Sequence, residues 1–278
     1  MGDRPISTIF SVGTELTEGT ILNTHFRFLG AELRGLGFFT RKAVQIPDDP
    51  DIFREELREA VRASGLVIVT GGLGPTSDDL TRETIAEVCA APLRFDQAIW
   101  DDLVQRYAAR GRSIAQTNRK QAQIPSGFRV LNNRVGSAPG FCGVDGACTV
   151  MALPGPPAEL EEMFLREALP LLQTRFFSSR GAAVELVATA IMIPESVLEQ
   201  ALQEARGSDA APRWSTRVAE DRIVWTLRGS QRRRQRRVYS ALLKRFGPLR
   251  IREGDVQPSF LPYRILSQRR ETVAVAES

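Results

Sequence analysis

The stretch that determines the fold class is residues 66–83, LVIVTGGLGPTSDDLTRE. Its first five residues form an apolar run, which is typical of a parallel strand covered by helices on both faces. Glycines fill three of the next four positions and turn the chain, and the sequence predicts a helix over 79–89. A buried strand, a glycine turn and a helix in this order indicate an α/β fold.

Strands and helices alternate on both sides of this stretch. Apolar runs predict the strands, and apolar residues at helical spacing predict the helices. The expected strands cover 6–13, 38–46, 66–70 and 149–153, and the expected helices cover 22–36, 51–64, 79–89, 96–110 and 158–172. We therefore predict a doubly wound, mostly parallel sheet in an α/β domain of residues 1–172.

The remaining sequence predicts a second, smaller domain. Residues 182–252 contain two strands, two helices and a short final strand, which indicates a small α+β module. Residues 253–262 contain one glycine and two prolines and are expected to be a linker. The end of the chain, 263–278, is predicted as a helix that leads into a strand.

Composition narrows the class of protein. With 42% hydrophobic and 25% charged residues in 278, the chain resembles an ordinary folded globular protein. No apolar run approaches the roughly 18 residues of a membrane span, so we expect a cytoplasmic protein with no membrane partner. Three cysteines in no metal-binding spacing are expected to be free thiols. Because His25 is the only histidine, carboxylates, lysine, asparagine or backbone groups must supply any acid–base or metal chemistry.

The turn after strand 66–70 has the composition of an anion site. Its glycines allow backbone N–H groups to approach a phosphate closely, and the helix that follows points the positive end of its dipole at the same place. The two adjacent aspartates are hard oxygen donors of the kind that Mg²⁺ binds beside phosphate. The alternative is a tight turn in which one aspartate caps the helix. The candidate substrate-binding residues of this turn are Gly71, Gly72, Gly74, Thr76 and Ser77, and the candidate metal ligands are Asp78 and Asp79.

Two further strand ends, at 13–15 and 154–157, are expected at the same edge of the sheet, because ligands of doubly wound folds bind beyond the carboxyl ends of the strands. A polar stretch after helix 96–110 adds an arginine–lysine pair that can neutralise phosphate. The alternative for 13–15 is an ordinary turn, and that for the polar stretch is an exposed loop. The alternative for 154–157 is a rigid entry into the following helix. The candidate substrate-binding residues here are Gly13, Thr14, Asn118, Arg119, Gly155, Pro156 and Glu159, and the candidate catalytic residues are Glu15 and Lys120.

Taken together, these motifs resemble those of the competence/damage-inducible protein CinA family over nearly the whole chain. The matching segments, in the family's order and spacing, are GTEL (13–16), TGGLGPTSDDLTRE (70–83), NRKQA (118–122), VGSAPGF (135–141) and LPGPPAE (153–159). The resemblance implies that residues 1–172 form a domain like the molybdopterin-binding domain of molybdenum-cofactor enzymes. It also implies that residues 182–252 form a KH-like module and that the protein is a homodimer.

The resemblance further implies a metal-dependent hydrolase of pyridine nucleotide metabolism. Such a domain cleaves the pyrophosphate bond of ADP-ribose or a related dinucleotide to AMP and a sugar phosphate. We expect Mg, Mn or Co to be held by Asp78 with Asp79 or Glu15, while Glu15 acts as general base and Lys120 stabilises phosphoryl charge, as does the glycine turn. The alternative is a non-catalytic protein that binds molybdopterin or a nucleotide, because fold alone does not determine function.

Some segments depart from the family or from that activity. The family usually has Asn at the position of His25, and a GIGES-like segment where residues 192–196 read MIPES. The last residues, 276–278, read AES and match the start of the AESCTGG-like motif of the family's nicotinamide-nucleotide amidase domain. We therefore expect a truncated member without amidase activity. The run QRRRQRR (231–237) carries five arginines, but no GXXG motif accompanies it, so we expect a solvated helix start and no nucleic-acid partner.

Overall fold

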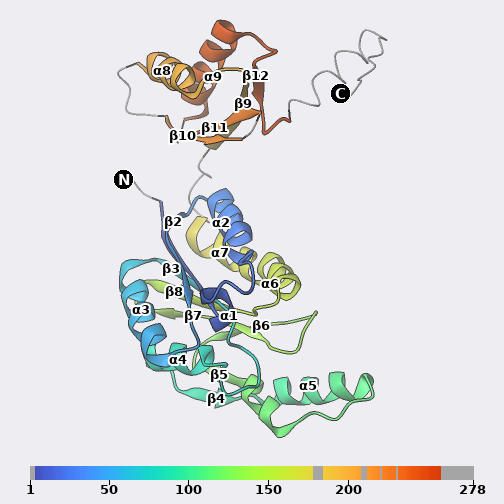
Figure 1. The fold of residues 1–278 in the computed structure, drawn as a ribbon. Coiled ribbons are helices and arrows are strands. Elements are labelled where there is room, and N and C mark those ends of the chain that lie inside the picture. Colours follow the sequence, from blue (N-terminus) through green and yellow to red (C-terminus); the bar gives the residue numbers. More distant parts are fainter. Residues whose placement is uncertain (1–3, 178–183, 208–211, 220, 230, 258–278) are drawn as a thin grey trace, which may run out of the picture. The chain divides into compact units, whose positions relative to one another are not determined.

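The structure is a computed structural model, and it describes residues 4–177, 184–207, 212–219, 221–229 and 231–257. The chain divides into two compact units, Met1–Ala182 and Ala183–Ser278, each with a sheet of its own (Figure 1). The predicted helix and strand over 263–278, the amidase-like end and half of the linker lie outside the described residues. None of the described helices combines the length and the apolar character needed to cross a membrane.

Unit 1 is built on a six-stranded sheet with the order β2-β1-β3-β8-β7-β6. The strands β2, β1, β3 and β8 are parallel, and β7 runs antiparallel to both of its neighbours. The predicted doubly wound, mostly parallel α/β fold is confirmed. The strands are β1 (Ile6–Val12), β2 (Phe39–Ile46), β3 (Leu66–Thr70), β6 (Arg129–Leu131), β7 (Gly140–Asp145) and β8 (Cys148–Leu153).

Helices cover both faces of this sheet, because successive side chains of its central strands point to opposite faces. Val67 of β3 packs in the cluster that contains Phe53 of α3, whereas Ile68 packs in the cluster that contains Leu29 of α2. All five residues of β3 are therefore buried. The helices of unit 1 are α1 (Thr14–Thr17), α2 (His25–Leu36), α3 (Pro50–Ala63), α4 (Thr81–Val88), α5 (Gln97–Ala109), α6 (Pro157–Met163) and α7 (Leu169–Phe177), with the 3₁₀ helix η1 (Gln116–Ala122) and the π-helical turn η2 (Phe164–Ala168).

Polar side chains set several helix boundaries. Asp49 and Asp96 cap α3 and α5 by accepting hydrogen bonds from backbone N–H groups of the first turns, as N-cap residues do. The helix predicted from residue 22 begins only at His25, whose backbone N–H donates to the side chain of Asn23. The helix predicted from residue 79 begins at Thr81, because Asp79 belongs to the preceding turn.

Four short strands between residues 93 and 145 were not predicted. β4 (Leu93–Phe95) and β5 (Gln123–Pro125) form a separate two-stranded sheet, while β6 and β7 extend the main sheet. Three of the four have only three residues, which is too short to show a periodic pattern.

The last helical segment of unit 1 extends beyond the predicted end at residue 172. It runs through α6, η2 and α7 to Phe177. Phe176 and Phe177 at its end pack edge-on against Phe38, with ring centroids 4.9 and 5.4 Å away. These aromatic contacts explain why the helix continues.

Unit 2 has the α+β composition that the sequence predicts. Its four strands form an antiparallel sheet with the order β10-β11-β9-β12. Trp225 lies fully buried in the core between this sheet and two helices. The sequence did not predict β10. The elements are β9 (Val184–Ile191), α8 (Glu195–Arg206), β10 (Arg213–Val218), β11 (Arg222–Gly229), α9 (Arg232–Phe246) and β12 (Ile251–Glu253).

Candidate functional site

Three strand ends meet at Gly71, as the sequence predicts. The backbone N–H of Gly71 donates to the carbonyl of Leu153 at the end of β8 (3.1 Å). A Cβ atom at Gly71 would collide with the carbonyl oxygen of Val12 at the end of β1, and one at Gly155 would lie 3.5 Å from the Cα of Gly71. Gly71 also has a φ of 90°, which disfavours other residues. Only glycine therefore allows this approach of β1, β3 and β8.

The glycine turn, residues 71–79, is held by the side chain of Asp79. Its carboxylate accepts hydrogen bonds from the backbone N–H groups of Gly74 (2.8 Å) and Thr76 (2.9 Å) and from the hydroxyl of Thr76 (2.6 Å). Both oxygens are thereby engaged in the turn. Asp79, expected as a metal ligand, and the Thr76 hydroxyl, expected at the substrate, serve here to fix the backbone.

The neighbouring Asp78 is different. Its side chain is exposed, and only the hydroxyl of Ser77 donates to it (3.1 Å). One carboxylate oxygen has no hydrogen bond or ion pair in the part of the chain that the structure describes. Of the two adjacent aspartates, Asp78 is thus the one that is free to bind a ligand.

Lys120 fixes the same turn from outside. Its ammonium donates to the carbonyl oxygens of Thr76 (3.1 Å) and Asp79 and forms an ion pair with Glu83 (3.3 Å). These three interactions use the three donors of a lysine. In this conformation Lys120 therefore positions the turn and has no donor left for a phosphate.

The end of β1 carries one engaged and one free side chain. The backbone N–H and hydroxyl of Thr14 both donate to the carboxylate of Asp48 (2.8 and 2.9 Å), so Thr14 joins β1 to the end of β2. The exposed carboxylate of Glu15 folds back over Gly13. A Cβ atom at Gly13 would lie only 2.4 Å from one of its oxygens. Among the described residues the Glu15 carboxylate has no hydrogen-bond partner. Glu15 and Asp78 are therefore the two free carboxylates that the sequence prediction placed at this edge.

The turn after β8 connects to a different loop. Pro156 is the N-cap of α6, and the Glu159 carboxylate accepts a hydrogen bond from the side chain of Asn133 (2.6 Å). That carboxylate lies so close to Gly136 that a Cβ atom there would overlap it. Glu159, expected at the substrate, here fixes the loop that contains Gly136.

The polar stretch at 116–122 forms η1. Asn118 is buried and donates to the side chain of Gln121 (2.9 Å), which in turn donates to Ser137 (3.1 Å). Ser137 lines a groove of about 310 Å³ between α5 and the loop after β6. Arg119 points elsewhere: its guanidinium lies over the ring of Phe95. The hydrogen bonds from this stretch to the glycine turn, among the described residues, come from Lys120.

The side chain of His25 connects the end of β3 to the turn after β8. It is buried, and its Nδ1 lies 2.9 Å from the hydroxyl of Thr70, the last residue of β3. The ring also hydrogen-bonds the backbone of Gly155, and burial lowers the pKa of the ring despite this bond. These contacts give His25 a structural role between the ends of β3 and β8.

Arg82 is a functional candidate that sequence reasoning missed. It follows Thr81, whose hydroxyl donates to the carbonyl of Gly71 (2.8 Å) and whose backbone N–H donates to that of Gly72 (3.2 Å). The Arg82 side chain is fully buried, and none of its nitrogens has a hydrogen-bond partner among the described residues. Burial lowers the pKa of Arg82 to about 10, partly offset by Asp79 and Glu83. Arginine is usually exposed, so nothing in a single sequence indicates this burial.

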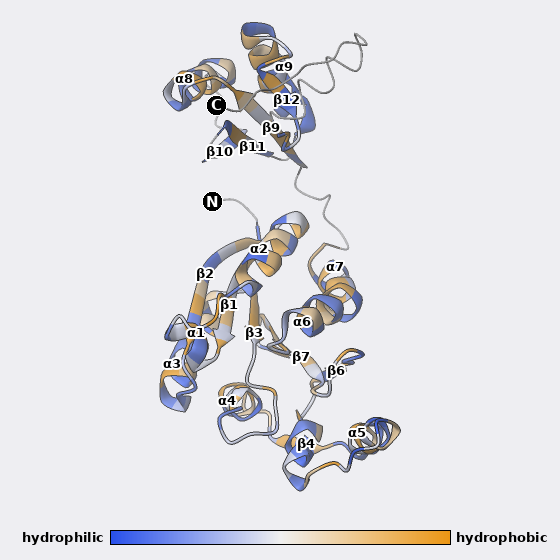
Figure 2. Ribbon diagram, turned by 45° about the vertical axis from the view of Figure 1, so that its right-hand side comes forward, coloured by the Kyte–Doolittle hydropathy of each residue, from blue (hydrophilic) through white to orange (hydrophobic). Residues whose placement is uncertain are grey.

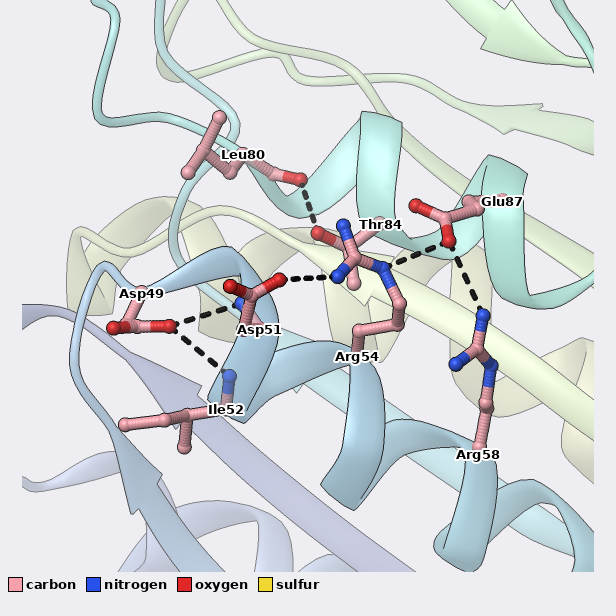
Figure 3. Close-up of polar contacts among 8 residues, drawn as sticks. All are labelled: Asp49, Asp51, Ile52, Arg54, Arg58, Leu80, Thr84 and Glu87. Carbon is pink, nitrogen blue, oxygen red and sulfur yellow. Dashed lines mark hydrogen bonds and ion pairs between the residues drawn. The ribbon is translucent and has the colours of Figure 1, made fainter.

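Ion pairs between α3 and α4 fix the helix that follows the turn (Figure 3). Arg54 of α3 contacts Asp51 (2.5 Å) on its own helix and Glu87 (2.8 Å) on α4, and Arg58 also reaches Glu87 (3.1 Å). Within α4 itself, the hydroxyl of Thr84 donates to the carbonyl of Leu80, the N-cap residue of the helix (2.9 Å). These ion pairs therefore hold the C-terminal end of α4 against α3.

The described residues contain no group of three histidine, cysteine, aspartate or glutamate side chains arranged to hold a metal ion. A cation would therefore need further ligands from a substrate or from water. Mg²⁺ is commonly bound in this way, by one or two carboxylates together with substrate phosphates.

Comparisons with known proteins identify the family and the fold of this chain. A family model described as "Probable molybdopterin binding domain" matches residues 8–174, which defines the class of α/β domain that unit 1 represents. The chain is 35% identical over 98% of its length to a relative from Symbiobacterium thermophilum named as a competence-damage inducible protein. It is 34% identical over 97% of its length to a CinA-like protein from Prochlorococcus marinus. The chain therefore belongs to the CinA-like family, as its motifs predict.

A solved structure is also similar to unit 1. The crystal structure of the protein CinA from Thermoplasma acidophilum is 31% identical, with a TM-score of 0.55, and the match covers 62% of this chain and 97% of that one. The chain spans 66% of the length of the Symbiobacterium relative and 64% of that of the Prochlorococcus relative. Any activity of those longer proteins can therefore be carried over to this chain only as a proposal.

Proposed function

We propose that unit 1 binds the diphosphate of ADP-ribose or a related dinucleotide and hydrolyses it to AMP and a sugar phosphate. The observation that carries this proposal is the glycine turn at the meeting point of β1, β3 and β8. There Asp79 holds the backbone while Asp78 is left free. The carboxyl edge of parallel strands is where doubly wound folds bind nucleotides.

The charges around the turn support binding of an anion. Arg82 places a buried positive charge directly after the turn, and the N-terminus of α4 faces Gly72. Both attract a phosphate, and a buried charge acts with little screening by solvent. Two free carboxylates at the same edge would repel such an anion unless a cation accompanied it. The combination therefore favours a phosphate that arrives with a divalent metal.

The donor set fits Mg, Mn or Co that is bound jointly by the protein and the substrate. Asp78 would hold the metal, with Glu15 as a second candidate, whereas Asp79 is committed to the turn. When bound, a divalent metal supplies Lewis-acid polarisation of a phosphoryl oxygen. Lys120 keeps the turn in place through Thr76 and Asp79 and acts as a positioning residue.

Glu15 is the proposed general base. Its carboxylate is exposed, has no partner among the described residues and lies over Gly13 at the end of β1. In the proposed mechanism it accepts a proton from the water that attacks phosphorus, and the phosphate of the leaving product takes the P–O bonding electrons. The glycine turn would meanwhile donate backbone N–H groups to the charge that develops.

The second candidate is a protein that binds a nucleotide or molybdopterin without turnover. The free carboxylates favour the hydrolase, because anion binding alone gains nothing from them. The test is AMP formation from ADP-ribose by the full chain, with Mg²⁺, Mn²⁺ or Co²⁺ and with EDTA. Metal-dependent AMP formation supports the hydrolase. Binding by calorimetry without AMP formation would favour the second candidate, and the absence of both would contradict the proposal.

A further inference from the structure

A groove of about 310 Å³ lies between α5 and residues 132–139, the loop that joins β6 to β7. In both Figures 1 and 2, α5 lies at the periphery of unit 1, and β6 lies between it and β7. The described residues that line this groove include none of the candidate substrate-binding, catalytic or metal-binding residues. Its volume is at the lower end of the range for small-molecule pockets, which suits one ring system of a dinucleotide.

The floor of the groove is apolar. Ile99 and Leu103 lie four residues apart on one side of α5, and both line the groove. Leu103 is buried, and Ile99 packs against the core cluster that contains Phe53. Val130 and Pro139 line the groove from β6 and from the loop. Such a floor gives a flat ring a contact surface, whereas a charged group that is buried there loses its hydration.

The charged side chains of the groove disfavour a phosphate. Asp96 and Asp102 carry two negative charges against the one positive charge of Arg106. The guanidinium of Arg106 is already engaged, because it pairs with Asp102 (2.7 Å) and donates to the carbonyl of Asn133 (2.5 Å). The groove therefore has a net negative charge, which repels an anion and admits an uncharged ring.

Three polar groups of the groove remain for a ligand. One oxygen of Asp96 caps α5, and the other accepts no hydrogen bond from the described residues. The hydroxyl of Ser137 accepts from Gln121 (3.1 Å), which leaves its proton to donate. The exposed amide of Asn132 makes no hydrogen bond within the described part of the chain. An acceptor, a donor and an amide match a base that carries an amino group beside a ring nitrogen.

We propose that the groove binds an amino-bearing nucleobase, which in ADP-ribose is adenine, while the diphosphate of the same molecule lies at the glycine turn. This inference rests on the proposed function, because it assigns a second part of the same substrate. The free oxygen of Asp96 accepts from the exocyclic amine. The amide of Asn132 pairs with the amine and the neighbouring ring nitrogen, as asparagine does with adenine in DNA. The ring lies on Ile99 and Leu103.

The 3₁₀ helix η1 connects the groove with the glycine turn. Lys120 donates to the carbonyl of Thr76 in the turn (3.1 Å). The next residue, Gln121, donates to Ser137 in the groove (3.1 Å). Two neighbouring residues of one short helix thus contact the two places, so the base and the diphosphate of one extended dinucleotide can occupy both.

The first experiment is calorimetry of the full chain with adenosine, which has the base and no phosphate. Ala98→Trp fills the groove, which Ala98 lines, and Ala108→Trp adds the same side chain to an exposed part of α5 outside it. We expect adenosine to bind the wild type and Ala108→Trp alike, and Ala98→Trp at least tenfold more weakly. Circular dichroism checks the fold of both variants. No binding of adenosine by the wild type, or equal affinities for the two variants, would overturn the proposal.

Inosine and a milder variant test the contact with the amine. Inosine has a carbonyl oxygen in place of the amine, and that oxygen meets the carboxylate of Asp96, so inosine should bind the wild type at least tenfold more weakly than adenosine. Asn132→Ala should keep the fold, because the Asn132 side chain is exposed, and should weaken adenosine binding several-fold. Equal affinity for the two nucleosides, or wild-type affinity of Asn132→Ala for adenosine, would place the base elsewhere.

Turnover separates this proposal from the proposed function. During metal-dependent AMP formation from ADP-ribose, Ala98→Trp should raise KM at least tenfold and leave kcat nearly unchanged, because binding of the base is lost equally from the ground state and the transition state. AMP formation with an unchanged KM would overturn the assignment of the groove and leave the hydrolase standing. Adenosine binding that Ala98→Trp weakens, without any AMP formation, would support the groove and contradict the hydrolase.

Discussion

The glycine turn (71–79) and the arginine-rich start of α9 (232–237) are both dense in polar residues, and the structure uses them in opposite ways. In the turn, side chains bind backbone: Asp79 accepts from two N–H groups, and Lys120 donates to two carbonyls. In α9, the arginines are exposed apart from Arg236, which is half-buried and pairs with Glu253 (2.6 and 2.8 Å).

This difference separates a preorganised site from a solvated surface. Hydrogen bonds from side chain to backbone hold the turn in one conformation, so its remaining free groups are already in position for a ligand. Exposed arginines gain little from their neighbours and lose side-chain entropy when they are fixed. Charge density alone therefore does not distinguish these two regions, whereas their hydrogen bonds do.

The largest expected effect comes from Asp78, the free carboxylate of the turn. Asp78→Asn should lower metal-dependent turnover of ADP-ribose by about 100-fold or more, because the proposed metal loses its protein ligand. Steady-state kinetics over a range of metal concentrations measures this, with thermal melting to confirm the fold. A folded variant with wild-type turnover would remove Asp78 from the mechanism.

Asp79 should affect stability instead. Asp79→Ala leaves the N–H groups of Gly74 and Thr76 without their acceptor, which costs roughly 2 kcal/mol of unfolding free energy. Urea unfolding followed by circular dichroism measures the change. Asp78→Ala is the matched control and should unfold like the wild type. Equal unfolding midpoints for both variants would show that Asp79 does not hold the turn.

Substitution of Arg82 should lower the affinity for nucleotide without lowering the stability of unit 1. Arg82→Met removes a buried charge that has no hydrogen-bond partner among the described residues, so unit 1 should be as stable as before or more stable. Affinity for a phosphate-containing nucleotide should fall several-fold, because a nearby positive charge is lost. Calorimetry and melting on the same samples test this. A large loss of stability would mean that the guanidinium is satisfied in solution.

The arginines of α9 should give only a weak, salt-sensitive effect. Binding of a labelled oligonucleotide should be detectable at low salt and should be lost at physiological salt, as expected for contacts with phosphate alone. Fluorescence anisotropy of the full chain, with Arg233→Gln as a comparison, measures it. Sequence-selective binding that persists at physiological salt would make α9 a recognition surface after all.

The smallest effect concerns His25 and pH. Burial lowers the pKa of its ring in the folded state below the ordinary value of 6.5. The neutral ring is therefore favoured on folding, and its stabilising contribution is present above about pH 6.5 and is lost as the pH falls from there through the lowered pKa. Because His25 is the only histidine, His25→Asn should flatten the stability profile below pH 6.5. An unchanged profile would place this titration elsewhere.

The core of unit 1 could be predicted from the sequence because its central strands are apolar runs. Such runs fit a parallel sheet that helices cover on both faces. Leu66–Thr70 is buried on both faces, and a strand of this kind belongs in a parallel sheet covered by helices. β4 and β6 were missed because three residues carry no periodic signal. β10 was missed because Arg213–Val218 is largely exposed at a sheet edge and lacks an apolar run.

The candidate site was predicted by location more than by role. Glycines and carboxylates at strand ends indicated which groups lie together at one edge of the sheet, since topology alone brings those ends together. Which of two adjacent aspartates faces the backbone depends on a turn conformation that the sequence does not encode locally. Thr14 donates a hydrogen bond to Asp48, and Glu159 accepts one from Asn133. Both bonds join segments that are distant in sequence, 34 and 26 residues apart, so neither could be predicted locally.

The π-helical turn at Phe164–Ala168 has a consequence for comparing relatives of this chain. A π turn contains one more residue than the α-helical turn that it replaces, and such turns arise within α-helices as single bulges. If a relative has a regular α-helix here, its sequence must be one residue shorter between α6 and α7 for Phe176 and Phe177 to stay in phase with Phe38. Otherwise every later side chain of α7 turns by about 100° around the helix axis. An alignment should therefore admit a one-residue gap in this segment, although helices ordinarily exclude gaps.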